Sequence, residues 1–182
     1  MTVSLPTARL LLRPWRDADV AAFVRLSADP AVTEFLRPLP DRAAAEARVA
    51  RVLEHWRRHG FGQWVVERPG KTGLVGVVGL AWVAYEAHFT PAVEIAWRLD
   101  RAHWGRGYAT EAARAALDYG FGKLGLDEIV AVTVPVNWRS RRVMERLGMS
   151  SVPEEDFAHP RLPDGPLKRH VLYRRHRPST AP

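Results

Sequence analysis

The spacing of apolar residues predicts a strand and then a helix at the start of the chain. Residues 8–13 (ARLLLR) alternate well enough for a strand, and Pro14 ends it because proline cannot donate to a strand ladder. Apolar residues at helical spacing follow Asp17, whose carboxylate can accept hydrogen bonds from the free amides of the first turn. We expect this helix to end before Pro30.

A second helix and three strands are predicted next. Asp41 stands in the capping position of a helix that we expect to reach about His59, where Gly60 follows the last apolar position. Runs rich in β-branched and aromatic residues then predict strands at 61–68, 74–85 and 92–100. The segment 69–73 (PGKTG) has turn chemistry. We therefore expect these strands to form an antiparallel meander.

The spacing of apolar residues alternates between helical and strand periods in the rest of the chain. It predicts a helix at 107–123, a strand at 128–134, a helix at 137–147 and a final strand at 167–176. The first of these helices has a narrow face of alanine and glycine, which permits close packing on a sheet, and Gly148 closes the second helix. We expect residues 1–176 to form a single domain and residues 177–182 to be a frayed tail.

Composition excludes several classes of protein. With 182 residues, 47% of them hydrophobic and 26% charged, the chain is neither disordered nor collagen-like. It has no apolar run long enough for a membrane helix and no signal sequence, so we expect a cytoplasmic protein without a membrane partner. The absence of cysteine excludes disulfides, thiolate catalysis and iron–sulfur clusters. Seven histidines without metal-site spacing predict no metal cofactor.

The charge favours an anionic ligand. The chain has 27 Lys and Arg against 20 Asp and Glu, a net charge of +7. A nucleotide, a nucleic acid or an acidic protein face would fit that sign. The surplus is spread over both halves of the chain rather than gathered in one basic block, which disfavours a nucleic-acid partner.

A Gly-x-Gly turn is the first motif with chemical meaning. Residues 94–112 (EIAWRLDRAHWGRGYATEA) predict a strand, a short turn with Gly105 and Gly107, and a helix. The free amides and the dipole of a helix N-terminus suit a pyrophosphate. No Walker A sequence is present, and Thr110 stands where a dinucleotide-binding G-x-G-x-x-G needs its third glycine. Alone, this turn also fits a strand-to-helix connection without a ligand.

A second motif, 137–149 (NWRSRRVMERLGM), follows at the next strand–helix junction. With both motifs, the sequence resembles the GCN5-related N-acetyltransferase (GNAT) superfamily, and within it the branch of ribosomal-protein alanine acetyltransferases of the RimJ/RimL type. The superfamily phosphate motif, Gln/Arg-x-x-Gly-x-Gly/Ala, falls on 104–109 (WGRGYA), with Trp in the first place, a departure common in that branch. RLLLRPW near the start and DPAVTEFL at 29–36 also match, so the resemblance covers residues 8 to about 150.

The resemblance implies an α/β (α+β) fold. Its central mixed sheet, mostly antiparallel, would have about seven strands and about four flanking helices, and would splay open between the fourth strand at 93–100 and the fifth at 128–134. Acetyl-CoA would lie in that notch as the co-substrate. The resemblance implies these cofactor-binding residues: Trp97 and Leu99 for the pantetheine, Arg106, Gly107, Tyr108 and Ala109 for the pyrophosphate, and Asn137 and Ser140 beside the thioester.

Acetyl transfer to an amine needs groups that handle protons. An alkylammonium with a pKa near 10 must lose a proton, and a thiolate with a pKa near 8.5 must be stabilised or protonated. The resemblance places Glu94 where this branch often has an acid that acts on the amine; the alternative is a strand glutamate in an ordinary ion pair. Ser140 is the candidate for the sulfur, or else a residue that satisfies free amides of its helix. An amide near Leu99 would stabilise the oxyanion.

These residues support one main hypothesis and two alternatives. We expect an N-acetyltransferase in which a primary amine, on a protein N-terminus or a small molecule, attacks acetyl-CoA directly. The alternatives are a basic RNA- or ribosome-associated binding protein and an acyl-CoA sensor without catalysis. The +7 charge argues against polycationic acceptors such as polyamines. A homodimer stays open, and the sequence sets neither the acceptor nor the acyl chain.

Overall fold

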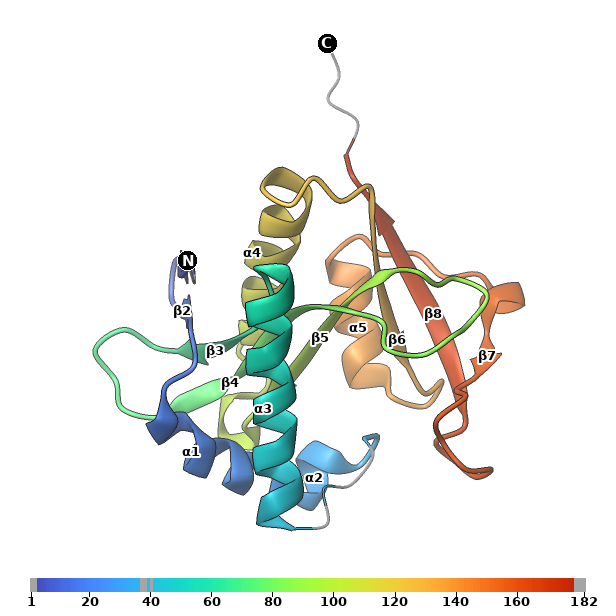
Figure 1. Cartoon of the computed structure of the whole chain (residues 1–182). Helices are drawn as coiled ribbons and strands as arrows, with labels where there is room; N and C mark the ends of the chain where they lie inside the picture. Colours follow the sequence, from blue (N-terminus) through green and yellow to red (C-terminus); the bar gives the residue numbers. More distant parts are fainter. Residues whose placement is uncertain (1–2, 37–38, 40, 179–182) are drawn as a thin grey trace.

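One sheet organises the molecule. The computed structural model describes residues 3–36, 39 and 41–178. The strands are β1 Leu5–Pro6, β2 Leu11–Arg13, β3 Gln63–Glu67, β4 Leu74–Trp82, β5 Val93–Leu99, β6 Glu128–Thr133, β7 Phe157–Ala158 and β8 Arg169–His176. Their order in the sheet is β1-β2-β3-β4-β5-β6-β8-β7, and every pair is antiparallel except β5 and β6. Figure 1 shows the sheet running from β2 at one side to β8 and β7 at the other.

Helices pack on both faces of this sheet. They are α1 Asp17–Ala28, α2 Pro30–Thr33, α3 Arg42–His59, α4 Tyr108–Gly122 and α5 Trp138–Arg146, with short 3-10 turns at Arg101–His103 and Pro153–Glu155. Phe23 of α1 and Val49 of α3 bury their side chains against Val77 of β4. On the opposite face, α4 buries Ala116 and Leu117 in the largest apolar cluster. This arrangement confirms the predicted mixed, mostly antiparallel fold.

Close packing of α4 on the sheet depends on its small residues. A Cβ atom on Gly120 would lie 2.6 Å from Cδ1 of Ile129 and 3.0 Å from Cδ1 of Leu80. Contacts that short would force these two methyl groups to move, so glycine at this position favours the observed close approach. The narrow alanine and glycine face predicted this contact between α4 and the sheet.

Three short elements were not predicted from the spacing of apolar residues. Among the described residues, the sheet has eight strands rather than about seven, and five α-helices rather than about four flank it, because β1, β7 and α2 were not expected. Two residues cannot show a strand period, and α2 is a single turn. Pro30 starts α2 as its first residue, with Asp29 accepting a hydrogen bond from the Ala31 amide at 2.8 Å.

The cap of α3 is as predicted, whereas that of α1 is not. Asp41 accepts a hydrogen bond from the Ala44 amide at 2.7 Å, and Gly60 ends the helix with φ +74°. Asp17 does not cap α1: the helix begins after Arg16, whose amide donates to Asp19 at 2.7 Å. The carboxylate three residues into the helix reaches back to the cap amide, as in half of a capping box.

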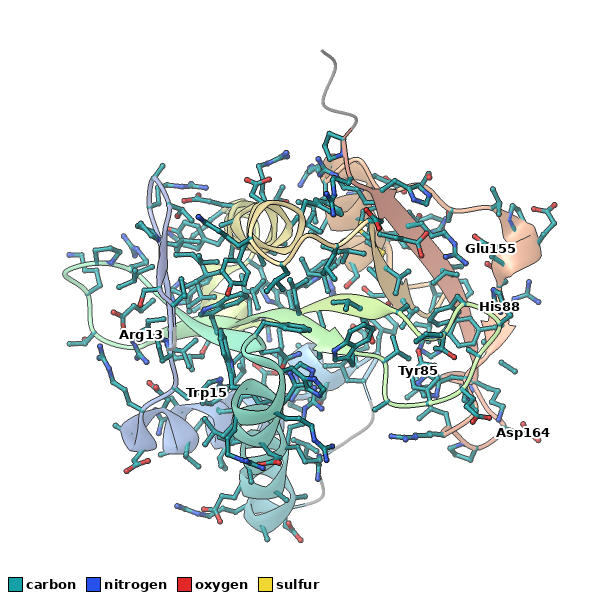
Figure 2. The ribbon with its side chains drawn as sticks, turned by 45° about the horizontal axis from the view of Figure 1, so that its top comes forward. Arg13, Trp15, Tyr85, His88, Glu155 and Asp164 are labelled. Carbon is teal, nitrogen blue, oxygen red and sulfur yellow. The ribbon has the colours of Figure 1, made fainter. Side chains whose placement is uncertain are left out.

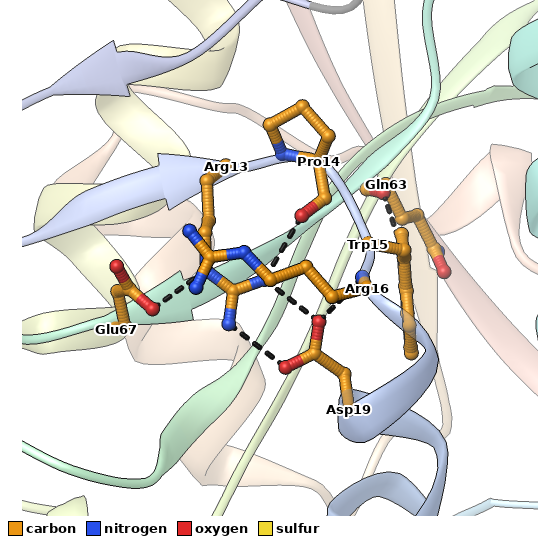
Figure 3. Close-up of polar contacts among 7 residues, drawn as sticks. All are labelled: Arg13, Pro14, Trp15, Arg16, Asp19, Gln63 and Glu67. Carbon is orange, nitrogen blue, oxygen red and sulfur yellow. Dashed lines mark hydrogen bonds and ion pairs between the residues drawn. The ribbon is translucent and has the colours of Figure 1, made fainter.

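Asp19 also belongs to a buried ionic network (Figure 3). The Arg13 guanidinium donates to Asp19 at 2.7 and 2.8 Å and to Glu67 at 2.6 Å. Arg13 and Asp19 are 6% and 8% exposed. The network therefore joins the end of β2, the first turn of α1 and the end of β3.

The N-terminal segment is fastened to α4. Glu111 accepts hydrogen bonds from the Thr7 hydroxyl at 2.6 Å, the Arg9 amide at 2.8 Å and the Arg9 side chain at 2.7 Å. These donors outweigh the effect of burial, which by itself raises the pKa of Glu111, and leave that pKa below its usual range. Glu111 is thus occupied by a structural contact beside the Gly-x-Gly turn.

A short segment after β8 contacts the rest of the fold. Of the tail predicted to fray, residues 179–182 lie outside the described residues, while the Arg177 amide donates to the Asp127 carbonyl at 2.8 Å. Within the described ranges, no helix has the length and apolar character needed to cross a membrane.

Candidate active site

β5 and β6 part soon after they meet. Glu94 and Val130 are their one pair of facing residues within the described chain. On its other side β5 stays paired with β4 along its whole length, from Val93 opposite Trp82 to Leu99 opposite Gly76. The edge of β5 beyond Glu94 is therefore open on the side of β6, which is the predicted splay.

The open edge carries the peptide groups of Trp97 and Leu99. The Asp100 amide donates to a β4 carbonyl at 2.9 Å, and the Ala92 carbonyl accepts from Val83 at 2.9 Å. Peptide groups alternate in direction along a strand, so the even-numbered residues of β5 pair with β4. The groups of Trp97 and Leu99 consequently face the gap, where the Leu99 carbonyl accepts the indole N–H of Trp104 at 3.0 Å.

A pocket of about 390 Å³ occupies this gap. Seven of the predicted site residues line it: Trp97, Leu99, Gly107, Tyr108, Ala109, Asn137 and Ser140. Two others do not. Arg106 lies in the same turn with an exposed side chain, and Glu94 is half-buried further back along β5.

The Gly-x-Gly turn presents free amides at one end of this pocket. Gly105 and Gly107 have φ of +73° and +77°, which other residues rarely adopt. The first helical hydrogen bond of α4 runs from the Glu111 amide to the Gly107 carbonyl at 3.0 Å. The amides of Tyr108 and Ala109 precede it and have no acceptor in the helix. They form a site with the polarity that an anion needs.

Asn137 and Ser140 are held by each other at the start of α5. The Asn137 side chain accepts the Ser140 amide at 3.2 Å and donates to the Thr133 hydroxyl at 2.9 Å and the Ser140 hydroxyl at 3.1 Å. Ser140 thus accepts a hydrogen bond rather than binding the free amides of its helix. Its own hydroxyl hydrogen remains to be donated on the pocket side.

Glu94 stands without a hydrogen-bond or ion-pair partner in the described part of the chain. Burial raises its pKa to about 7, and the positive charge of Arg48 on α3 partly opposes that rise. A carboxylate with such a pKa is ionised for part of the time at neutral pH and can exchange a proton there. The side chain lies on the face of β5 opposite to that of Trp97.

Two further groups line the pocket that the sequence reading did not single out. The first is apolar and comes from α2 and the residues after it: Ala31, Val32, Phe35 and Leu36. The second is basic and lies on α5: Arg139, Arg142 and Arg146. Their spacing of three and four places these arginines on one helix face, a signal present in the sequence. Arg139 lies over the Trp104 ring at 4.7 Å and pairs with Glu34.

Metal ligands do not gather anywhere among the described residues. No three His, Cys, Asp or Glu side chains come close enough to hold an ion. Within the pocket, His103 instead has a buried ring nitrogen, Nδ1, that lacks a hydrogen-bond partner in the described chain. A ligand group that donates or accepts one hydrogen bond would satisfy it.

The family model for the acetyltransferase (GNAT) domain matches residues 9–150. The chain belongs to the GNAT acetyltransferase family. It is 34% identical to the uncharacterized protein YkkB of Bacillus subtilis (strain 168) over 146 residues, 80% of this chain and 84% of YkkB. It is 33% identical to the FsC-acetyl coenzyme A-N(2)-transacetylase of Aspergillus fumigatus over 156 residues, 82% of this chain and 66% of that protein.

Solved structures agree with the GNAT fold. The acetyltransferase from Agrobacterium tumefaciens str. C58 superposes with a TM-score of 0.77 at 29% identity, over 96% of this chain and 94% of that one. The ribosomal L7/L12 acetyltransferase RimL, in complex with coenzyme A, gives a TM-score of 0.77 at 17% identity, over 96% and 98% of the two chains. Similarity at 17% identity shows the fold alone, so membership of the RimJ/RimL branch stays a prediction.

Proposed function

We propose that this GNAT protein transfers an acetyl group from acetyl-CoA to a primary amine, which attacks the thioester directly. The pocket between β5 and β6 carries the proposal, because one opening contains an unpaired strand edge, a helix N-terminus and a free hydroxyl. The matching relative from Aspergillus fumigatus, named as an acetyl coenzyme A transacetylase, supports the same chemistry.

The pocket has the groups that acetyl-CoA needs. The turn amides of Arg106, Gly107, Tyr108 and Ala109 would hold the pyrophosphate by backbone hydrogen bonds and helix-dipole attraction. Trp97 and Leu99 would pair with the pantetheine as strand residues pair with a peptide. When bound, acetyl-CoA supplies the activated acetyl group.

Glu94 would take the proton of the amine, directly or through a water. An amine with a pKa near 10 is almost wholly protonated at neutral pH, and only its neutral form is nucleophilic. A carboxylate with a pKa of about 7 accepts that proton better than an ordinary glutamate does. Its negative charge also attracts the ammonium form of the acceptor.

Ser140 and Leu99 would act on the thioester itself. The Ser140 hydroxyl lines the pocket with its hydrogen free to donate to the departing sulfur. The Leu99 amide faces the gap, where it would stabilise the negative oxygen that develops on attack. The chain has no cysteine to form a thioester intermediate, which agrees with a direct transfer.

Thiol release measures this reaction. The protein should release coenzyme A from acetyl-CoA only when an accepted amine is present, in a panel that includes N-terminal peptides and small amines. Binding of acetyl-CoA without release for any amine would indicate the acyl-CoA sensor instead. Salt-sensitive RNA binding without acetyl-CoA binding would indicate the RNA-associated protein.

A further inference from the structure

A second set of charged groups lies behind the pocket, on the face of β5 that α1 and α3 cover. Glu94 and Arg98 share this face because they are four residues apart on one strand. Arg48 of α3 lies within electrostatic range of both side chains. We call Arg48, Glu94 and Arg98 the acceptor-side cluster.

Arg98 is fixed in place but lacks a counter-ion. Its guanidinium donates to the Ser27 hydroxyl at 2.8 Å and lies 5.4 Å from the centre of the Phe23 ring. In the described chain no carboxylate lies within 4 Å of it, although it also lines the pocket. Burial, with the nearby charge of Arg48, lowers its pKa to about 10. A guanidinium held this way retains donors that no group of the described chain accepts.

Arg48 also lacks a counter-ion in the described chain. It is half-buried, and among the described residues it has neither a hydrogen bond nor an ion pair. Burial and the charge of Arg51 lower its pKa, whereas Glu94 partly opposes that change. Two partly desolvated cations therefore share one carboxylate. Buried charges in proteins are ordinarily paired, so the charges of this cluster favour the binding of an anion.

Tyr85 adds a third unused donor. It lies on the loop between β4 and β5 (Figure 2), and its hydroxyl is buried without a partner in the described chain. Burial, and next the negative charge of Glu94, raise its pKa, so the hydroxyl keeps its hydrogen. Arg161 lies within electrostatic range of the same hydroxyl. Donors and positive charges thus outnumber acceptors around Glu94.

We propose that the acceptor is a primary amine that also carries a carboxylate, such as a free amino acid. Its ammonium group would lie at Glu94, near the Tyr85 hydroxyl, and its carboxylate would lie at Arg48 and Arg98. A carboxylate completes the charge balance of the cluster, and the planar guanidinium groups can bind it through paired hydrogen bonds. A polyamine would bring more positive charge to a cluster that already has an excess.

This assignment rests on the proposed acetyl transfer, and coenzyme A does not remove the need for it. The phosphates of the coenzyme would lie at the turn of Gly105 and Gly107, with Arg142 and Arg146 of α5 on the same pocket. Its pantetheine has no charge. The anion that Arg48 and Arg98 favour is therefore assigned to the acceptor.

Matched pairs of amines test the proposal on the unaltered protein. We would compare 4-aminobutanoate with 4-aminobutanamide, and L-alanine with L-alaninamide, at saturating acetyl-CoA, with amine concentrations counted as the ammonium form that would lie at Glu94. Since a hydrogen bond to a charged group changes binding about 10- to 100-fold, we expect kcat/KM to favour the carboxylate by that factor. Equal values for acid and amide, or a preference for spermidine, would overturn it.

Variants of Arg48 and Arg98 test whether these arginines bind the carboxylate of the acceptor. Arg98→Met and Arg48→Met should each raise KM for the carboxylate amine about 10-fold or more, a larger change than for its amide, with KM for acetyl-CoA unchanged. Arg51→Met removes the same charge from an exposed position of α3 and should leave every constant unchanged. A rise in KM for acetyl-CoA in the first two variants would assign them to the coenzyme and contradict the proposal.

A binding measurement separates this inference from the proposed function. Calorimetric titration of 4-aminobutanoate into the protein loaded with coenzyme A does not depend on catalysis. Binding that Arg98→Met abolishes supports the anion site even if no acetyl transfer is detected. Transfer to amides as fast as to acids, without such binding, would leave the acetyltransferase intact and reject the carboxylate-bearing acceptor.

Discussion

Glu94 has no hydrogen-bond or ion-pair partner in the described chain, and this sets its proton-transfer chemistry. Because burial raises its pKa to about 7, the ionised form that accepts a proton grows as the pH rises through 7. We predict that kcat of the protein increases across this range. Glu94→Gln should lower kcat and remove that increase while leaving acetyl-CoA affinity nearly unchanged. A variant with the wild-type rate and pH profile would show that Glu94 is not the base.

Ser140 is predicted to assist departure of the thiolate. Ser140→Ala removes the hydroxyl that Asn137 orients, and kcat should fall about 100-fold or more with little change in the affinity for acetyl-CoA. Ser151→Ala, at an exposed position, is the matched control. Steady-state kinetics on both variants decide the matter, because an unchanged kcat in Ser140→Ala would leave the serine with a structural role only.

His170 is predicted to make the fold sensitive to acid. Burial lowers its pKa to about 4, so between pH 6.5 and 4 the unfolded chain binds a proton that the folded chain does not. Stability is complete above pH 6.5 and falls as the pH decreases, by about 2 kcal/mol at pH 5. Urea unfolding of the wild type and His170→Phe at pH 7.5 and 5 should show a smaller loss in the variant. An equal loss in both proteins would contradict this account of His170.

At the scale of elements, the Arg13 network is predicted to hold β2, α1 and β3 together. Burial tends to raise the pKa of Asp19, but hydrogen bonds from Arg13 and the Arg16 amide lower it overall. Its contribution is present above the ordinary aspartate pKa and is lost as the pH falls through the lowered value. Asp19→Asn should destabilise the protein by about 3 kcal/mol at pH 7, as removal of one partner from a buried ion pair does.

Asp17→Asn is the control for that network. Asp17 is exposed and does not cap the helix. The free energy of unfolding of the Asp17→Asn variant should therefore stay within about 0.5 kcal/mol of the wild-type value. Urea denaturation at neutral pH measures both variants. A cost for Asp17→Asn as large as that for Asp19→Asn would assign the cap back to Asp17.

The elements that the sequence predicts are those long enough to show a period. The cap at Asp41, the glycine at Gly60 and the narrow face of α4 are local signals, and the structure confirms them. The choice between Asp17 and Asp19 depends instead on where Arg13 lies in the fold. The short α2, whose segment forms a wall of the pocket, has no period to detect.

For the whole molecule, the active-site prediction comes from resemblance rather than from pattern. Seven of the predicted residues do line one pocket, although Trp97 and Ser140 are 43 positions apart in sequence. The pocket exists because β5 and β6 diverge. Divergence between two strands gives no signal in the sequence of either strand. The contribution of Arg98 is hidden for the same reason: only the packing of α1 and α3 shows that it has no counter-ion.

We propose that the gap between β5 and β6 binds acetyl-CoA through the turn at Gly107. Calorimetric titration of acetyl-CoA into the protein tests it directly, with Gly107→Val as the disabled variant. Gly70→Val is the control, since Gly70 has nearly the same positive φ, +72° against +77°, in a turn remote from the pocket. We predict one-to-one micromolar binding in the wild type and in Gly70→Val, and none in Gly107→Val. No binding by the folded wild type, or undiminished binding by Gly107→Val, would contradict it.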